Sequence, residues 1–303
     1  MIDRVDTANS FIREGNFEKA RKIYSDLLDA DPEDLSFIAG FFISSYWDNR
    51  LELVLRIREG KERGRKFVSL FEEFDREIRE RKYPLAEPYQ AATQCILGEA
   101  SFHFKLAYQK EGNMGLEPAV LTELALCLIR TGDYKNASDI LAYGQSLKKS
   151  AQNTFYRAEC LFFMDKEKEG KAAYMEGFLS DPSVLHPEII HSEPLRTAIA
   201  TIARSFEKTS DMKEYLPVYC LEKKLLPVLG LEADFVKNLF REISRLHDNL
   251  QKSSSHKFKL SCRILVIGIH ILENTSAEEE INEKTRSMMM EAEPDFLNRF
   301  YSI

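Results

Sequence analysis

The chain has 303 residues, 44% of them hydrophobic, so it can bury a sizeable core as one elongated solenoid or two subdomains. It has only 13 Gly and 10 Pro, which argues against an all-β protein and against disorder. The net charge of −7 at pH 7 does not suggest a non-specific nucleic-acid binder. We therefore expect an all-α protein with no specific nucleic-acid partner.

The first predicted element is a pair of helices. The sequence breaks at Gly15-Asn16, so an earlier helix over about 3–13 should end there, and Pro32 should end the next one. A single apolar stripe marks the second helix and consists of Phe17, Ala20, Ile23, Tyr24 and Leu27. One such hairpin cannot bury its whole stripe, so it needs a neighbour.

The segment 35–117 is predicted to hold longer helices. The stretch 36–47 is expected to be a helix that is apolar nearly all round. The stretch 51–83 is expected to be one long helix or two helices broken near Gly60, and 88–109 a further helix.

The hairpin pattern recurs at 118–150, with Gly132, Tyr134 and Ala137 at the offsets of Gly15, Phe17 and Ala20. It recurs more loosely at 151–184. These units resemble the tetratricopeptide repeat, a helix–turn–helix of about 34 residues with small residues, aromatics and a closing Pro at fixed places. Arg4 and Thr154 stand where that repeat usually has an aromatic residue. The resemblance implies a helical-hairpin solenoid over 1–184, with clear repeats at 1–34, 118–150 and 151–184 and degenerate ones at 35–117.

The remainder, 185–303, is predicted to be a C-terminal helical subdomain that covers the end of the solenoid. It follows a Pro-rich connection over 181–194, which we expect to cross the surface. The apolar run "ILVIGIHIL" (264–272) is expected to be a fully buried helix, and Ser276 with Glu279 forms a capping box. The expected helices lie at about 195–208, 212–226, 232–250, 258–273 and 277–291, followed by a short one in 294–302.

No catalytic motif is present in the sequence. It lacks HExxH, a Walker A loop, GxSxG and a dinucleotide-binding Gly-rich loop. We therefore expect no enzyme activity, no catalytic residue, no cofactor and no metal site. A third hypothesis, an enzyme with an unrecognised site in the C-terminal third, is disfavoured.

The cysteines and the apolar runs bear on location. The five Cys form no CxxC pair and are expected to be buried reduced thiols, which favours a reducing compartment and a cytoplasmic protein. The run 264–272 is much shorter than the ~20 residues that span a bilayer, so we expect no transmembrane segment. The N-terminus does not look like a signal peptide, so a periplasmic or secreted location would require that one was removed.

A basic cluster over 56–66 has two interpretations. It could bind an anionic partner, or it could be an exposed helix face balanced by nearby acids. No aromatic residues interleave with the basic ones, so there is no stacking platform for nucleic acid, and the balanced face is favoured.

The resemblance also implies a site. In the family the first helix of each repeat lines a concave groove that holds a partner peptide or helix. The alternative for the aromatic residues is packing against the helices from 195 onward. Carried over by register, the groove residues are Asn9, Arg13, Glu123, Arg130, Phe155, Tyr156, Glu159 and Phe163.

The leading hypothesis is a non-enzymatic protein–protein interaction module, an adaptor or assembly scaffold that binds a partner protein or peptide in the groove. The alternative is a regulator or transport accessory protein that binds a small molecule or signal peptide in the solenoid. The sequence leaves homo-oligomerisation open. Of the basic clamp with which some family members bind acidic C-termini, only Asn9 is matched, so that mode of binding is not expected.

Overall fold

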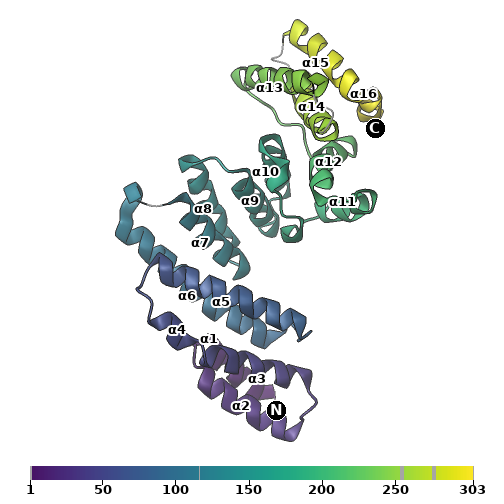
Figure 1. Cartoon of the computed structure of the whole chain (residues 1–303). Coiled ribbons are helices and arrows are strands. Elements are labelled where there is room, and N and C mark those ends of the chain that lie inside the picture. The colour runs from purple at the N-terminus through teal and green to yellow at the C-terminus, as the bar shows by residue number, and fades with distance from the viewer. Residues whose placement is uncertain (1, 116, 253–255, 275–277, 303) are drawn as a thin grey trace. The chain divides into compact units, whose positions relative to one another are not determined.

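The computed structural model describes residues 2–115, 117–252, 256–274 and 278–302 (Figure 1). Throughout these ranges the regular elements are α-helices and short 3-10 turns, and none is a β-strand. Consecutive helices pack against one another in chain order, which confirms an all-α helical solenoid. Among the described helices, none contains a stretch both long and apolar enough to cross a bilayer.

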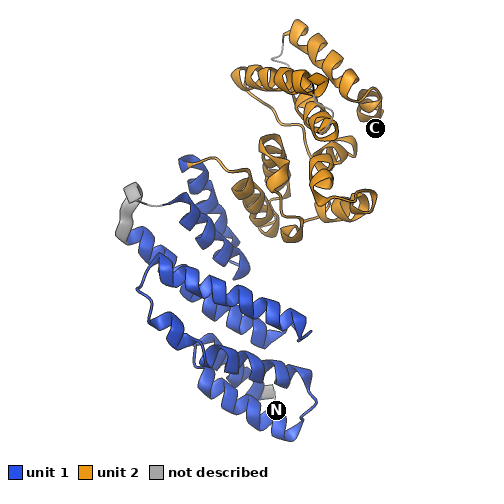
Figure 2. Ribbon diagram, in the orientation of Figure 1, with its two compact units in different colours: residues 1–147 blue, residues 148–303 orange. Residues whose placement is uncertain are grey.

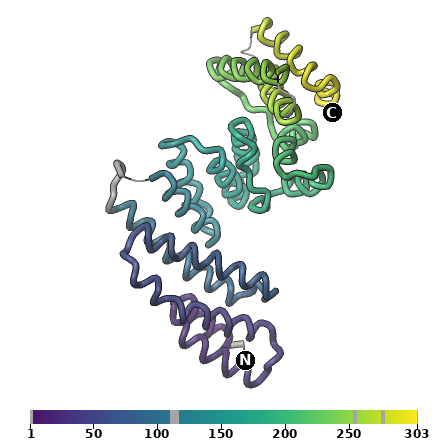
Figure 3. The backbone as a smooth tube through the Cα atoms, viewed as in Figure 1, coloured from purple at the N-terminus to yellow at the C-terminus, as the bar shows by residue number. Residues whose placement is uncertain are grey.

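The chain divides into two compact units, which we call unit 1 (residues 1–147) and unit 2 (residues 148–303) (Figure 2). Figure 3 shows the path of the backbone through the successive helices of each unit. The predicted boundary after residue 184 separates helical repeats from the C-terminal subdomain. The division into compact units does not test it, and it stays a prediction.

Unit 1 is a stack of helical hairpins. Helix α2 packs on α1 and α3, α6 packs on α1, α3 and α5, and α7 packs on α6 and α8. The bounds are α1 Ile2–Arg13, α2 Phe17–Ala30, α3 Leu35–Asp48, α4 Leu51–Leu55, α5 Lys61–Glu80, α6 Glu87–Gly115, α7 Pro118–Arg130 and α8 Tyr134–Leu147. Of the two alternatives for 51–83, the structure has the two helices: residues 56–60 separate α4 from α5, and Gly60 has a φ of +114° that glycine adopts without strain.

The same turn ends the first helix of all three matched hairpins. After α1 the chain takes a positive φ at Gly15, after α7 at Gly132, and after α9 (Ala151–Phe163) at Asp165. In each case the next residue donates its N–H to the carbonyl five residues back, at 2.8 to 2.9 Å. This Schellman arrangement satisfies carbonyls that the helix end would leave unpaired. The same backbone turn therefore recurs at equivalent positions of the three hairpins.

The register also places small residues where paired helices meet. Ala20 and Ala137 are fully buried, and a Cβ added to Gly170 at the equivalent position would lie 2.6 Å from the Phe162 ring. Larger side chains at these places would collide with the partner helix.

We therefore expect Ala137→Leu to lower the free energy of unfolding by about 1–3 kcal/mol, because the extra atoms overpack the contact between α7 and α8. Urea denaturation measures this loss. Ala142→Leu is the matched control, since Ala142 lies on the same helix but is exposed and should tolerate the change. Equal stability of the two variants would show that the register is wrong.

Unit 2 is built around a buried helix. Helix α14 packs on α12, α13 and α15, and every residue from Cys262 to Ile271 is buried, so the prediction for "ILVIGIHIL" is confirmed except at its last residue, Leu272, which is half-buried. The remaining bounds are α10 Glu167–Ser180, α11 Leu195–Ile202, α12 Thr209–Glu222, α13 Ala233–Lys252, α14 Lys257–Leu272, α15 Glu279–Ala292 and α16 Phe296–Tyr301. The capping box predicted at Ser276 lies outside the described residues.

Two helices of unit 2 end earlier than predicted. Helix α11 gives way to a short 3-10 turn after Ile202, and α12 ends at Glu222 rather than near 226. Lys224 has a positive φ and Pro227 follows, so the helix cannot continue. The backbone turn that Gly15 makes after α1 is here made by a lysine.

A buried arginine joins α14 to the end of α10. Arg263 donates from Nη1 to the carbonyl of Phe178 at 2.5 Å and from Nη2 to that of Leu179 at 2.8 Å. These are carbonyls that a helix end leaves without an intrahelical partner, and the cation also complements the negative end of the helix. The hairpin α9–α10 therefore shares one core with the C-terminal helices.

Candidate functional site

The eight residues predicted for the groove fall in both units, and each set is described by itself. Asn9, Arg13, Glu123 and Arg130 lie in unit 1, and Phe155, Tyr156, Glu159 and Phe163 lie in unit 2.

Arg13 and Glu123 form ion pairs with neighbouring helices. Arg13 Nη2 on α1 lies 2.8 Å from Glu87 Oε1 at the start of α6. On α7, Glu123 accepts hydrogen bonds from Arg65 Nε of α5 at 3.1 and 3.0 Å, one to each carboxylate oxygen. Both pairs are partly open to solvent, with side-chain exposures from 32% to 51%.

Arg130 on α7 lies against α5 as well. Its Nη2 is 3.7 Å from Asp75 Oδ2, and its guanidinium lies 4.7 Å from the centre of the Phe71 ring. Asp75 also accepts hydrogen bonds from Tyr89 at 2.5 Å and from Arg79 at 3.0 Å. Burial alone would raise the pKa of Asp75, but the hydrogen bonds from Tyr89 and Arg79 outweigh it and lower the pKa below its ordinary value.

The ion pairs join α1 to α6 and α5 to α7, and the hydrogen bond from Tyr89 of α6 to Asp75 of α5 links these two pairs of helices. We call the set the charged belt; it consists of Arg13, Arg65, Asp75, Glu87, Glu123 and Arg130. Half-buried Leu126 lies on α7 between Glu123 and Arg130, three residues after the first and four before the second, so the three share a helix face. The belt can offer a partner both signs of charge beside an apolar residue.

Asn9 is fully buried rather than part of that surface. Its Oδ1 accepts a hydrogen bond from the Tyr24 hydroxyl at 2.6 Å, across the α1–α2 hairpin. In unit 2, Tyr174 donates to Glu159 across the α9–α10 hairpin at the same spacing of fifteen residues. The two pairs occupy equivalent places in their repeats, so this register position holds a hairpin together in both units.

Glu159 is the centre of a buried polar cluster. It is 3% exposed, and besides Tyr174 it accepts the His191 N–H at 3.0 Å and the Ser192 hydroxyl at 2.5 Å. Burial, followed by the nearby Glu159 charge, raises the pKa of Tyr174, so its hydroxyl stays a donor. The carboxylate therefore binds the protein's own chain.

The connection 181–194 does more than cross the surface. Leu185 and Ile190 are buried, and residues 191–192 bond to Glu159. The Phe163 ring on α9 lies 6.2 Å from the His191 ring. This segment therefore packs against the residues of α9 that the register assigns to the groove.

The aromatic residues of α9 differ in exposure. Phe155 is buried, with its ring 5.1 Å from that of Phe178 on α10, and Tyr156 is buried and accepts a hydrogen bond from Gln152. Phe163 is 44% exposed. Of the four residues predicted here, Phe163 alone is open enough to meet a partner directly, and partner binding by this face stays a prediction.

The basic cluster at 56–66 is largely paired within unit 1. Arg63 donates to the carbonyls of Leu55 and Ile57, Lys61 pairs with Glu117, and Arg65 belongs to the charged belt. These contacts support the balanced-face interpretation.

The five cysteines are all free, and four of them are buried. Burial raises the pKa of Cys127 and of Cys262 to about 12, which keeps both as unreactive thiols near neutral pH. In the part of the chain that the structure describes, no group of three or more His, Cys, Asp and Glu side chains is placed to hold a metal ion.

Three belt residues on α5 and α6, namely Arg65, Asp75 and Glu87, are not among the predicted groove residues, although Arg65 belongs to the basic cluster at 56–66. They lie in the degenerate segment 35–117, where no register assigns a side chain to a face. Each of them has the opposite charge to the predicted residue with which it pairs, and this complementarity is the signal in the sequence that could have found them. Comparisons of the chain with protein-family models, with curated proteins and with solved structures found no match.

Proposed function

We propose that this protein is a non-enzymatic protein–protein interaction module, an adaptor or assembly scaffold of the tetratricopeptide-repeat type. In this proposal the charged belt of unit 1 holds a peptide or helix of the partner. The observation that carries the proposal is that Arg13, Glu123 and Arg130 stand at the surface in ion pairs a partner can replace.

The repeat type is supported by features common to the three matched hairpins. In each hairpin a residue with positive φ follows the first helix, and a small residue lies where the second helix crosses the first. Repeats of this kind commonly expose an extended binding surface along the stacked helices.

The energetics of the belt suit reversible binding. An exposed ion pair typically contributes about 0–1 kcal/mol, so the partly exposed pairs of Arg13 with Glu87 and of Arg65 with Glu123 open at little cost. A partner segment with acidic and basic side chains can form new pairs in its place, and an apolar side chain can cover Leu126. A segment with mixed charges and one apolar face, most simply an amphipathic helix, fits this surface best.

A cytoplasmic location is part of the proposal. It is supported by five free thiols, four of them buried, which is the expected state in a reducing compartment.

The test uses peptides of fifteen residues selected from a random library on the full chain. We expect Glu123→Arg to weaken binding of the selected peptides at least tenfold, about 1.4 kcal/mol, because it reverses the charge that the partner meets. The double variant Arg65→Glu/Glu123→Arg restores an ion pair with the opposite orientation. We expect it to recover the small stability loss of the single variant but not the binding, as measured by fluorescence polarisation.

Lys135→Glu is the control, an exposed charge reversal on α8 outside the belt, and it should bind like the wild type. Wild-type affinity in the double variant would mean that the partner does not read the belt charges, and the proposal would fail.

A further inference from the structure

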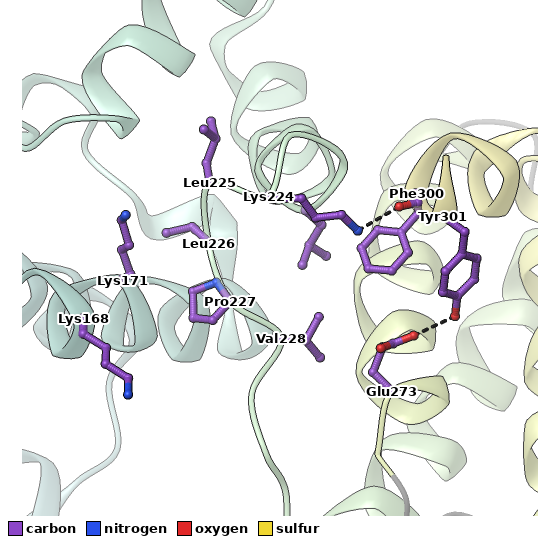
Figure 4. Close-up of a pocket in the computed structure, with 11 residues that line it drawn as sticks. Lys168, Lys171, Lys224, Leu225, Leu226, Pro227, Val228, Glu273, Phe300 and Tyr301 are labelled. Atoms are coloured by element: carbon purple, nitrogen blue, oxygen red, sulfur yellow. Dashed lines mark hydrogen bonds between the residues drawn. The ribbon is translucent and has the colours of Figure 1, made fainter. Parts of the chain in front are cut away.

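A cavity of about 450 Å³ lies in unit 2 (Figure 4). Lys168 and Lys171 of α10 stand on one side of the connection that follows α12, and Phe300 and Tyr301 of α16 stand on the other. The volume is within the range of ordinary ligand pockets. None of these residues belongs to the charged belt.

The inner wall of the cavity is apolar. Leu221 is 1% exposed, and Leu226 and Phe300 are each 4% exposed. Contacts that the protein makes itself hold this wall in place. Lys224 donates to the Phe300 carbonyl at 2.7 Å, and the Tyr301 hydroxyl donates to Glu273 at 2.7 Å. The cavity therefore offers a preformed place for one apolar side chain.

The rim toward α10 carries available positive charge. Lys168 has no ion-pair partner among the described residues, and Lys171 pairs at 2.6 Å with Glu167, whose side chain is 62% exposed. Such an exposed pair exchanges readily. Glu273 on the opposite side is already engaged by Tyr301. The charged residues that line the cavity are three lysines, Lys168, Lys171 and Lys224, and the engaged Glu273, so an acidic group is the complementary ligand.

The connection itself has backbone groups to offer. Asn274 holds two of its residues, donating to the Leu229 carbonyl at 3.2 Å and accepting the Leu231 N–H at 2.8 Å. Val228 and Gly230 alternate along the chain with Leu229 and Leu231, and their backbone groups make no hydrogen bond to any described residue. Unpaired backbone groups at alternate residues are what an added strand requires.

We propose that this cavity binds an extended segment of a partner protein that carries an apolar side chain next to an Asp or Glu. The apolar side chain fills the space beside Leu226 and Phe300, and the acidic group meets Lys168 and Lys171. The partner's backbone pairs with Val228 and Gly230. A fatty acid would match the wall and the lysines but would leave the backbone groups unpaired, so the peptide is favoured.

The test uses a random library of octapeptides, acetylated and amidated so that neither end is charged. Peptides are selected on the full wild-type chain after depletion on the double variant Lys168→Gln/Lys171→Gln, which leaves those that depend on the two lysines. We expect the selected peptides to share an apolar residue beside Asp or Glu. Replacing that acid by its amide should weaken binding at least tenfold in fluorescence polarisation.

Two controls make the test specific. Lys237→Gln/Lys252→Gln removes the same charge from exposed positions on α13 and should leave binding unchanged. Two further peptides carry methyl groups on alternate backbone nitrogens, one on the odd-numbered residues and one on the even-numbered residues. One of them should lose binding and the other should keep it, because only one edge of the extended peptide pairs with the connection.

Three results would overturn the proposal: no peptide survives depletion, binding is insensitive to backbone methylation in both registers, or decanoate displaces the peptides while methylated peptides still bind. The last would assign the cavity to a small amphipathic carboxylate. Because the belt variants lie in unit 1, failure here leaves the proposed function separately testable.

Discussion

Replacing Glu159 by alanine is expected to lower the free energy of unfolding of unit 2 by about 3 kcal/mol. The substitution leaves four donors without this acceptor, namely the hydroxyls of Tyr174 and Ser192, the N–H of His191 and, at a longer 3.4 Å, the N–H of Ser192. Each buried donor left unpaired costs on the order of 1 kcal/mol or more. The connection 181–194 also loses its polar anchor on α9, so it should open more often.

Peptide-resolved hydrogen exchange measures this loss within unit 2. Asn9→Ala is the matched comparison in unit 1, where one donor, Tyr24, loses its acceptor and about 1 kcal/mol is expected. Fluorescence of Trp47, the one tryptophan of the chain, reports that change in unit 1. If Glu159→Ala were no more destabilising than Asn9→Ala, the polar cluster would not hold the connection.

Unit 2 is also expected to lose about 2 kcal/mol of stability between pH 7 and pH 5 through His270 alone. The side chain is fully buried, and its Nε2 has no hydrogen-bond partner among the described residues. Burial lowers the pKa of His270 to about 4, despite the hydrogen bond between Nδ1 and the Val266 carbonyl at 2.8 Å. In the unfolded chain the pKa is near its ordinary value of about 6.5.

Acidification destabilises unit 2 because the unfolded state takes up a proton at His270 before the folded state does. As the pH falls below about 6.5, the unfolded chain binds a proton at His270 while the folded chain does not, so unfolding is favoured. The stabilisation is complete above the unfolded pKa and is lost progressively down to about pH 4, where the folded state is protonated as well.

His270→Leu isolates this effect from the titration of carboxylates. The variant should match the wild type at pH 7, because an apolar side chain suits the buried site and leaves no unpaired nitrogen. Urea denaturation at pH 7 and pH 5 should then show about 2 kcal/mol less pH dependence in the variant. Identical pH dependence in both proteins would mean that His270 is protonated equally in the folded and unfolded states.

Two of the three matched hairpins could be predicted from sequence because their turns carry a glycine, whereas the third turns at Asp165 and matches more loosely. Gly15 and Gly132 adopt the positive φ that only glycine takes up freely, so the pattern marks the turn directly. The turns after α5 and α12 have the same backbone form with Lys82 and Lys224 at the left-handed position. Lysine gives no such signal, so the predicted end of α12 near residue 226 lies about four residues beyond the observed end at Glu222.

The site could be predicted only in part, because register assigns a residue to a helix face but does not say what covers that face. The register assigns Arg13, Glu123, Arg130 and Glu159 alike to the groove face. The first three lie at the surface, whereas Glu159 is covered by residues 191–192. The covering segment is irregular, and its contacts depend on where Leu185 and Ile190 find apolar neighbours. No periodic pattern encodes that.

Hydrogen exchange of the full chain, with and without a peptide selected for binding that depends on Glu123, tests partner binding at the charged belt most directly. We expect slower exchange in α5 (Lys61–Glu80) and α7 (Pro118–Arg130), which carry four of the six belt residues. Unchanged exchange in both helices, or protection confined to unit 2, would contradict partner binding at the charged belt.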